Sequence, residues 1–174
     1  GLAWAMIPAI LKVRFGTNEI LVSLMLVYVA EQLLASMALG LLRNPEGFGF
    51  PGSRNLQQYP SAFNAALIAV IFAYTLLAKH RMGFAIKVTG SAPRAAKFGG
   101  VRPARVILFC LGLSGLLAGL AGMFEVAGPS GQITIDFASG YGFTAIIVAF
   151  LGRLNPLGIV AAGLQLALTE IGGD

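Results

Sequence analysis

Residues 106–124 read VILFCLGLSGLLAGLAGMF, a run without a single charged side chain. A helix rises about 1.5 Å per residue, so it needs roughly 20 residues to cross the ~30 Å hydrocarbon core of a bilayer. This run is long enough and apolar enough to do so. It therefore predicts a membrane-spanning helix.

Two more runs reach a similar length. Residues 20–42 form the first, interrupted by Glu31 and Gln32, and residues 61–78 form the second, without a charge. Residues 2–11 resemble the end of a truncated helix. Residues 137–152 and 157–169 would be about 24 Å and 20 Å long as helices. We expect these two to be half-helices or a broken pair around GRLNPLG.

The composition agrees with this pattern. Of the 174 residues, 57% are hydrophobic and only 11% are charged, against about 25% in a typical soluble domain, and the mean hydropathy is +0.82. The predicted fold class is an all-α integral membrane protein, a polytopic helix bundle with three full spans near 20–42, 61–78 and 106–124. Both ends of the chain lie in or just after apolar runs. We therefore expect residues 1–174 to be one transmembrane domain of a longer chain.

Basic side chains are concentrated between residues 79 and 105. This segment holds seven of the chain's twelve Lys and Arg residues and no Asp or Glu, whereas residues 125–136 hold two acidic residues and no basic one. Lys and Arg are enriched in cytoplasmic loops. The charges thus predict two loops on each side of the membrane: 12–19 and 79–105 inside, 43–60 and 125–136 outside.

Several function classes find little support in the sequence. The net charge of +5 comes from loops, and no basic helix carries interleaved aromatic residues, so nucleic acid is not expected as a partner. The single cysteine, Cys110, excludes an internal disulfide and a thiolate metal site. The printed sequence contains no GxxxxGK[ST], HExxH or GxSxG motif, and its lone histidine, His80, lies in the basic loop. We expect neither catalysis nor metal binding by this chain.

The run at 106–124 carries small residues at helical spacing. Such residues let helix backbones approach closely in lipid. The pattern predicts either ordinary packing inside the bundle or an interface between subunits. The candidate packing residues are Ser114, Gly115, Ala118, Gly119 and Gly122.

Residues 87–101, KVTGSAPRAAKFGGV, form a polar, basic island between apolar runs. Ser91 is a good N-cap, Pro93 is tolerated in a first turn, and the glycines at 99 and 100 favour a helix end. A helix of about two turns is unstable alone in water. It would therefore dock on another molecule. The alternative is a basic loop lying against anionic lipid headgroups.

Polar side chains within spans are candidates for a translocation pathway, because they are costly in lipid and usually face a cavity or a partner. The candidates are Glu31, Asn64 and Asn155. A hydrogen-bonded or neutral side chain within the bundle is the alternative for Glu31. The break containing Asn155 either lines a cavity or is a plain turn at the membrane surface. Asn18 precedes a predicted helix and is interpreted as its N-cap.

Three motifs in the same order resemble a known family. KVTGSAPRAAKFGGV (87–101) is similar to the cytoplasmic coupling segment of ABC-importer permeases of the branched-chain amino acid, ribose and nucleoside superfamily. LKVRFGTNEILVSLMLVYVA (11–30) and GFTAIIVAFLGRLNPLGIVAAGL (142–164) resemble segments of the simple-sugar and nucleoside permeases within it.

This resemblance implies a permease subunit of an ATP-driven importer in the bacterial cytoplasmic membrane. The implied partners are two cytoplasmic ABC ATPase subunits, which bind ATP and magnesium, a second permease subunit, and an extracytoplasmic substrate-binding protein. The implied substrates are nucleosides or simple sugars. A passive channel or facilitator for a small polar solute is the alternative. The implied coupling residues are Ser91, Ala92, Pro93, Arg94, Ala95, Ala96, Lys97, Phe98 and Gly99.

Overall fold

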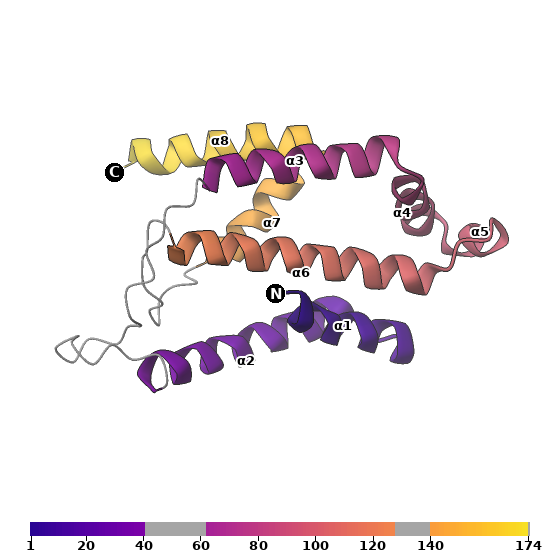
Figure 1. Cartoon of the computed structure of the whole chain (residues 1–174), viewed down its shortest axis with the longest axis horizontal. Coiled ribbons are helices and arrows are strands. Elements are labelled where there is room, and N and C mark those ends of the chain that lie inside the picture. Colours follow the sequence, from indigo (N-terminus) through magenta and orange to yellow (C-terminus); the bar gives the residue numbers. More distant parts are fainter. Residues whose placement is uncertain (41–61, 128–139, 174) are drawn as a thin grey trace. The chain divides into compact units, whose positions relative to one another are not determined.

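The computed structural model describes residues 1–40, 62–127 and 140–173, and within these ranges all regular secondary structure is helical (Figure 1). This confirms the predicted all-α class. The described residues fall into two compact units: Gly1–Ala62 with Ala85–Phe137, and Phe63–Phe84 with Ala138–Asp174. The helices are α1 (Leu2–Phe15), α2 (Glu19–Leu39), α3 (Ala62–Lys79), α4 (Arg81–Ser91), α5 (Pro93–Phe98), α6 (Pro103–Ala127), α7 (Tyr141–Leu151) and α8 (Pro156–Gly173).

Three of the described helices are long and apolar enough to cross a membrane: Glu19–Leu39, Pro103–Val126 and Pro156–Gly173. The first two correspond to the predicted spans at 20–42 and 106–124. The third is longer than the predicted half-helix at 157–169. Its last turn continues through Glu170, since one carboxylate in a final turn does not stop a helix as a proline would.

The predicted span at 61–78 is helical as α3, but the chain then turns sharply. A bend of 74° separates residues 64–79 from α4, as in a broken span or a re-entrant loop. The corner depends on Gly83, because a Cβ atom there would overlap the carbonyl oxygens of Leu76 and Leu77. The sequence pattern did not indicate α4 as a separate helix.

A tight turn joins α1 to α2 in the first unit. Gly16 adopts a left-handed conformation (φ 63°), and its N–H donates to the carbonyl oxygen of Lys12, as is usual at a helix C-terminus. The side-chain oxygen of Asn18 accepts a hydrogen bond from the Ile20 N–H at 3.0 Å, which confirms the predicted N-cap. Across the turn, the Lys12 ammonium lies 2.5 Å from the Glu19 carboxylate.

In the same unit, α1 packs closely against α6. A Cβ on Gly115 would overlap that of Ala5, and one on Gly119 would lie 2.9 Å from the Cα of Gly1. A Cβ on Gly112 would lie 3.5 Å from the Met6 sulfur. Residues later in α1 thus contact residues earlier in α6, so the two helices are antiparallel. The end of α1 and the start of α6 therefore lie at the same end of this unit (Figure 1).

In the second unit, α7 and α8 form an antiparallel pair joined by residues 152–155. The break falls where the sequence predicts it. Gly152 and Gly158 bring the two backbones together, because a Cβ on Gly152 would lie 2.5 Å from the Ile159 nitrogen. Between them, Arg153 and Leu154 both adopt left-handed conformations, with φ of 54° and 57°. Such conformations are costly for residues other than glycine.

Candidate coupling segment and membrane pathway

The predicted short helix in the basic island is α5, and it begins one residue later than expected. Its N-cap is Ala92, with Pro93 at the first helical position. The prediction of Ser91 as N-cap is wrong. Ser91 is the last residue of α4, and its hydroxyl donates back to the Lys87 carbonyl at 2.9 Å, so it completes that helix instead.

The end of α5 is closed by hydrogen bonds that fix its exit direction. The N–H of Gly100, which is left-handed at φ 79°, donates to Lys97 O at 3.2 Å. The Val101 N–H donates to Ala96 O at 3.0 Å. This pair of bonds is the Schellman pattern. It ends the helix at Gly99, as predicted, and holds α5 to the chain entering α6.

Among the described residues, one side of α5 is covered and the other is exposed. Ala96 is 1% exposed, and α5 contacts α6. Phe98, by contrast, is 94% exposed, and Arg94, Ala95 and Lys97 are also exposed. Exposure of a whole aromatic side chain leaves a large apolar area in contact with water. The free side of α5 is therefore a small apolar surface bearing two positive charges.

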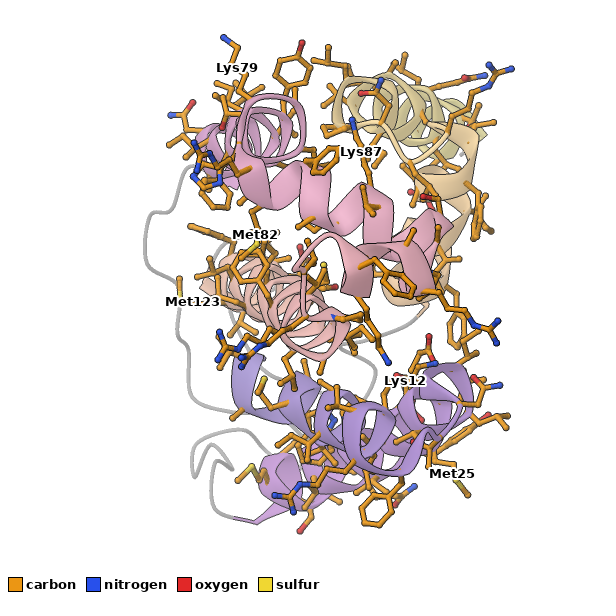
Figure 2. The ribbon with its side chains drawn as sticks, turned by 90° about the vertical axis from the view of Figure 1, so that its right-hand side faces the viewer. Lys12, Met25, Lys79, Met82, Lys87 and Met123 are labelled. Atoms are coloured by element: carbon orange, nitrogen blue, oxygen red, sulfur yellow. The ribbon has the colours of Figure 1, made fainter. Side chains whose placement is uncertain are left out.

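The end of the first unit that carries α5 is strongly basic. Arg102 and Arg105 flank the start of α6, and Lys87 lies on α4. The antiparallel packing of α1 on α6 brings Lys12 and Arg14 to the same end. Figure 2 looks at this end, with Lys12 and Lys87 labelled. In the first unit, residues 12–14 and 87–105, both predicted to be cytoplasmic, thus lie at the same end. The predicted external loop at 43–60 lies outside the described residues, as do residues 128–136 of the one predicted at 125–136, whose first three residues belong to α6.

The three pathway candidates lie on three different elements. Glu31 is exposed in the middle of α2, and Asn64 is exposed in the first turn of α3. Asn155 caps α8, with its side-chain oxygen accepting from the Leu157 N–H at 3.3 Å. This cap gives the Asn155 side chain a structural role that needs no ligand. The pathway role of all three residues stays a prediction.

The small residues of α6 form two separate lines. Gly115 and Gly119 face α1 inside the first unit. Ser114 and Ala118 are exposed, and a Cβ on Gly122 would meet nothing within 4 Å. One line therefore packs within the chain and the other is left on its surface.

Two structural features were not predicted from the sequence pattern. One is the corner at Gly83, which links α3 to the coupling segment, and the other is the left-handed pair Arg153–Leu154. A glycine shortly after the Lys79–Arg81 charge cluster was the available signal for the first. No signal marked the second, because arginine and leucine rarely adopt this conformation.

These features define a polytopic helical membrane protein with a short, basic, exposed helix between two of its membrane segments. The chain belongs to the family described as "Branched-chain amino acid transport system / permease component", whose model matches residues 1–174. No solved structure matches the chain.

Three relatives illustrate the family. The glucose ABC transporter permease protein TsgB13 of Haloferax volcanii is 34% identical over 195 residues, covering 100% of this chain and 51% of its own length. The guanosine permease protein NupP of Bacillus subtilis is 28% identical, covering 97% and 53%. The nucleoside permease protein NupB of Lactococcus lactis is also 28% identical, covering 95% and 51%. The chain thus spans about half the length of these relatives.

Proposed function

We propose that this chain is part of the permease subunit of an ATP-driven importer for nucleosides or simple sugars, located in the cytoplasmic membrane. Its family membership supports the permease role, and the relatives named for glucose, guanosine and nucleosides support the substrate class. The observation that carries the proposal is the short helix α5, which presents an exposed aromatic and two cations at the basic end of the first unit.

In this proposal, α5 docks in a groove of a cytoplasmic ABC ATPase subunit. The ATPase subunits bind ATP and magnesium and carry out hydrolysis, and this chain has no catalytic role. Closure of the ATPase pair would pull on α5. Its Schellman bonds, including Val101 N–H to Ala96 O at 3.0 Å, would pass that movement to α6. The glycine corner at Gly83 would pass it, through α4, to α3.

The rest of the importer supplies the remaining steps. A second permease subunit would complete the pore, and an extracytoplasmic binding protein would deliver the solute. Glu31, Asn64 and Asn155 are the proposed pathway residues, because polar groups at membrane depth are favoured only next to water, ligand or a polar partner. They lie on α2, on α3 and at the α7–α8 corner.

Photo-cross-linking from Ala95 tests the coupling role. Ala95 is exposed on α5, so a photoreactive residue fits there without displacing the chain. After irradiation of native membranes containing the full-length protein, we expect an adduct with a P-loop ATPase. The matched control places the same residue at Ala167, which is exposed on α8, and no ATPase adduct is expected there. Adducts with lipid alone at Ala95 would contradict the coupling role and favour the passive channel.

A further inference from the structure

The span α2 carries polar side chains on one face at membrane depth. Tyr28, Glu31 and Gln32 lie in the central third of the candidate span Glu19–Leu39, and all three are exposed. Residues two positions apart on a helix point in nearly opposite directions. Tyr28 and Gln32 therefore lie opposite the partly covered Ala30, on the side of α2 that the described residues leave open.

These three side chains have no polar partner within the part of the chain that the structure describes. The Tyr28 hydroxyl, the Glu31 carboxylate and the Gln32 amide form no hydrogen bond or ion pair there. A carboxylate or an amide that faces hydrocarbon is costly, and such groups within a span usually face water, a ligand or a polar partner. The face that carries them is therefore unsuited to contact with lipid.

The exposed residues beside this face at the same depth are apolar. Val29 and Leu33 are 48% and 47% exposed. Each follows a polar residue by one position, which turns it about 100° around the helix. Their side chains suit a lipid-facing surface. The change from polar to apolar around one helix at one depth indicates that only the face of Tyr28 and Gln32 borders water or a polar ligand.

The polar character also ends part-way along the face. Two turns toward the predicted cytoplasmic end, Tyr28 and Gln32 are followed on this face by Leu21 and Met25, which are 60% and 71% exposed. One turn toward the predicted external end lies Ser36, which is also exposed. Water that enters along this face from outside would thus reach the middle of the span and meet an apolar barrier there.

We infer that this face of α2 lines a water-filled cavity, open to the outside, that ends near Tyr28 and holds the solute there. The solute class rests on the proposed function, and its shared chemistry is a ring with neighbouring hydroxyl groups, as in a ribose or a hexose. The Glu31 carboxylate accepts hydroxyl hydrogens, the Gln32 amide donates to solute oxygens, and the Tyr28 ring packs against the apolar side of the solute. Tyr28 and Gln32 thus join Glu31 as residues that determine specificity.

Thiol accessibility tests the cavity without requiring transport. Gln32→Cys and the matched control Leu33→Cys are made in the full-length protein, in a cysteine-free background that includes Cys110→Ala. The assembled importer, in right-side-out membrane vesicles, is treated with a charged, membrane-impermeant methanethiosulfonate. Gln32→Cys is expected to react at least about tenfold faster, because the charged reagent and the thiolate are both disfavoured in hydrocarbon. Tyr28→Cys is the second reporter on the same face if Gln32→Cys assembles poorly.

Protection by solute tests the binding site and separates the two solute sources. Guanosine and glucose are added separately before the reagent. One of them, at about ten times its dissociation constant, is expected to slow the labelling of Gln32→Cys about tenfold, since about a tenth of the sites stay free. Equal labelling of Gln32→Cys and Leu33→Cys would overturn the cavity, and protection by neither solute would overturn the binding site.

Glu31→Gln tests the carboxylate, because it keeps the shape of the side chain and removes its charge. The solute concentration that gives half-protection is expected to rise about tenfold, since a hydrogen bond to a charged group is stronger than one to a neutral amide. An unchanged concentration would remove Glu31 from the solute site. Protected labelling without ATP-driven uptake would contradict the proposed importer and support the cavity, so the two can fail separately.

Discussion

Gly115→Leu is expected to lower the free energy of unfolding by about 3 kcal/mol, because overpacking a tight helix contact forces backbones apart. A Cβ at this position already overlaps that of Ala5, and α1 has no room to yield without losing its contacts at Gly112 and Gly119. Thermal unfolding of the purified full-length protein in detergent, followed by intrinsic fluorescence, measures the change. Trp4 lies on α1 and reports on that helix.

The control is the same substitution about two turns further along α6, in the line of small residues that α1 does not cover. Gly122→Leu adds the same side chain to α6 at a place where a Cβ would meet nothing within 4 Å. Both variants gain the same helix propensity, about 1 kcal/mol for removing a glycine, so their difference isolates the contact with α1. Equal stability of the two variants would mean that α1 does not pack on α6 as described.

Phe98→Ala is expected to weaken binding of the ATPase by about 30-fold, because burial of a phenylalanine side chain contributes about 2 kcal/mol. Phe98 is 94% exposed in this chain, so its removal costs little within the subunit. Alanine is also the better helix former, so α5 should persist. Retention of the ATPase on the immobilised full-length protein, measured over a range of ATPase concentrations, gives the affinity.

Phe143→Ala is the matched control for this measurement. Phe143 is a 56% exposed aromatic in the first turn of α7, far along the chain from α5. Its loss should leave ATPase affinity unchanged. An equal effect of the two variants would show that ATPase binding responds to general destabilisation, and no effect of Phe98→Ala would exclude this side chain from the docking surface.

Much of the fold follows from local sequence signals. Apolar length alone predicts α2 and α6, and the turn between α1 and α2 follows from a glycine and an asparagine cap at Gly16 and Asn18. The break at 152–155 follows from the GRLNPLG motif. These features are predictable because each depends on residues close together in the chain.

The remaining features depend on which of two possible hydrogen bonds a side chain forms, or on contacts between segments far apart in the chain. Ser91 has the right chemistry for an N-cap, but α4 extends far enough for its hydroxyl to bond to Lys87 O instead. The two lines of small residues on α6 look equivalent in sequence, and only the position of α1 decides that Gly115 and Gly119 are the packed ones. The exposed side of α5 was foreseeable as a basic helix, but not the almost complete exposure of Phe98.

ATP-driven uptake tests the proposed function most directly. The full-length protein, its second permease subunit, its ATPase and its binding protein are reconstituted into liposomes, and entry of radiolabelled guanosine and glucose is followed with and without ATP. The proposal predicts that one of these solute classes accumulates above the external concentration only when ATP is supplied. Equilibration of the solute at the same rate without ATP would contradict it, because that is the behaviour of a passive channel.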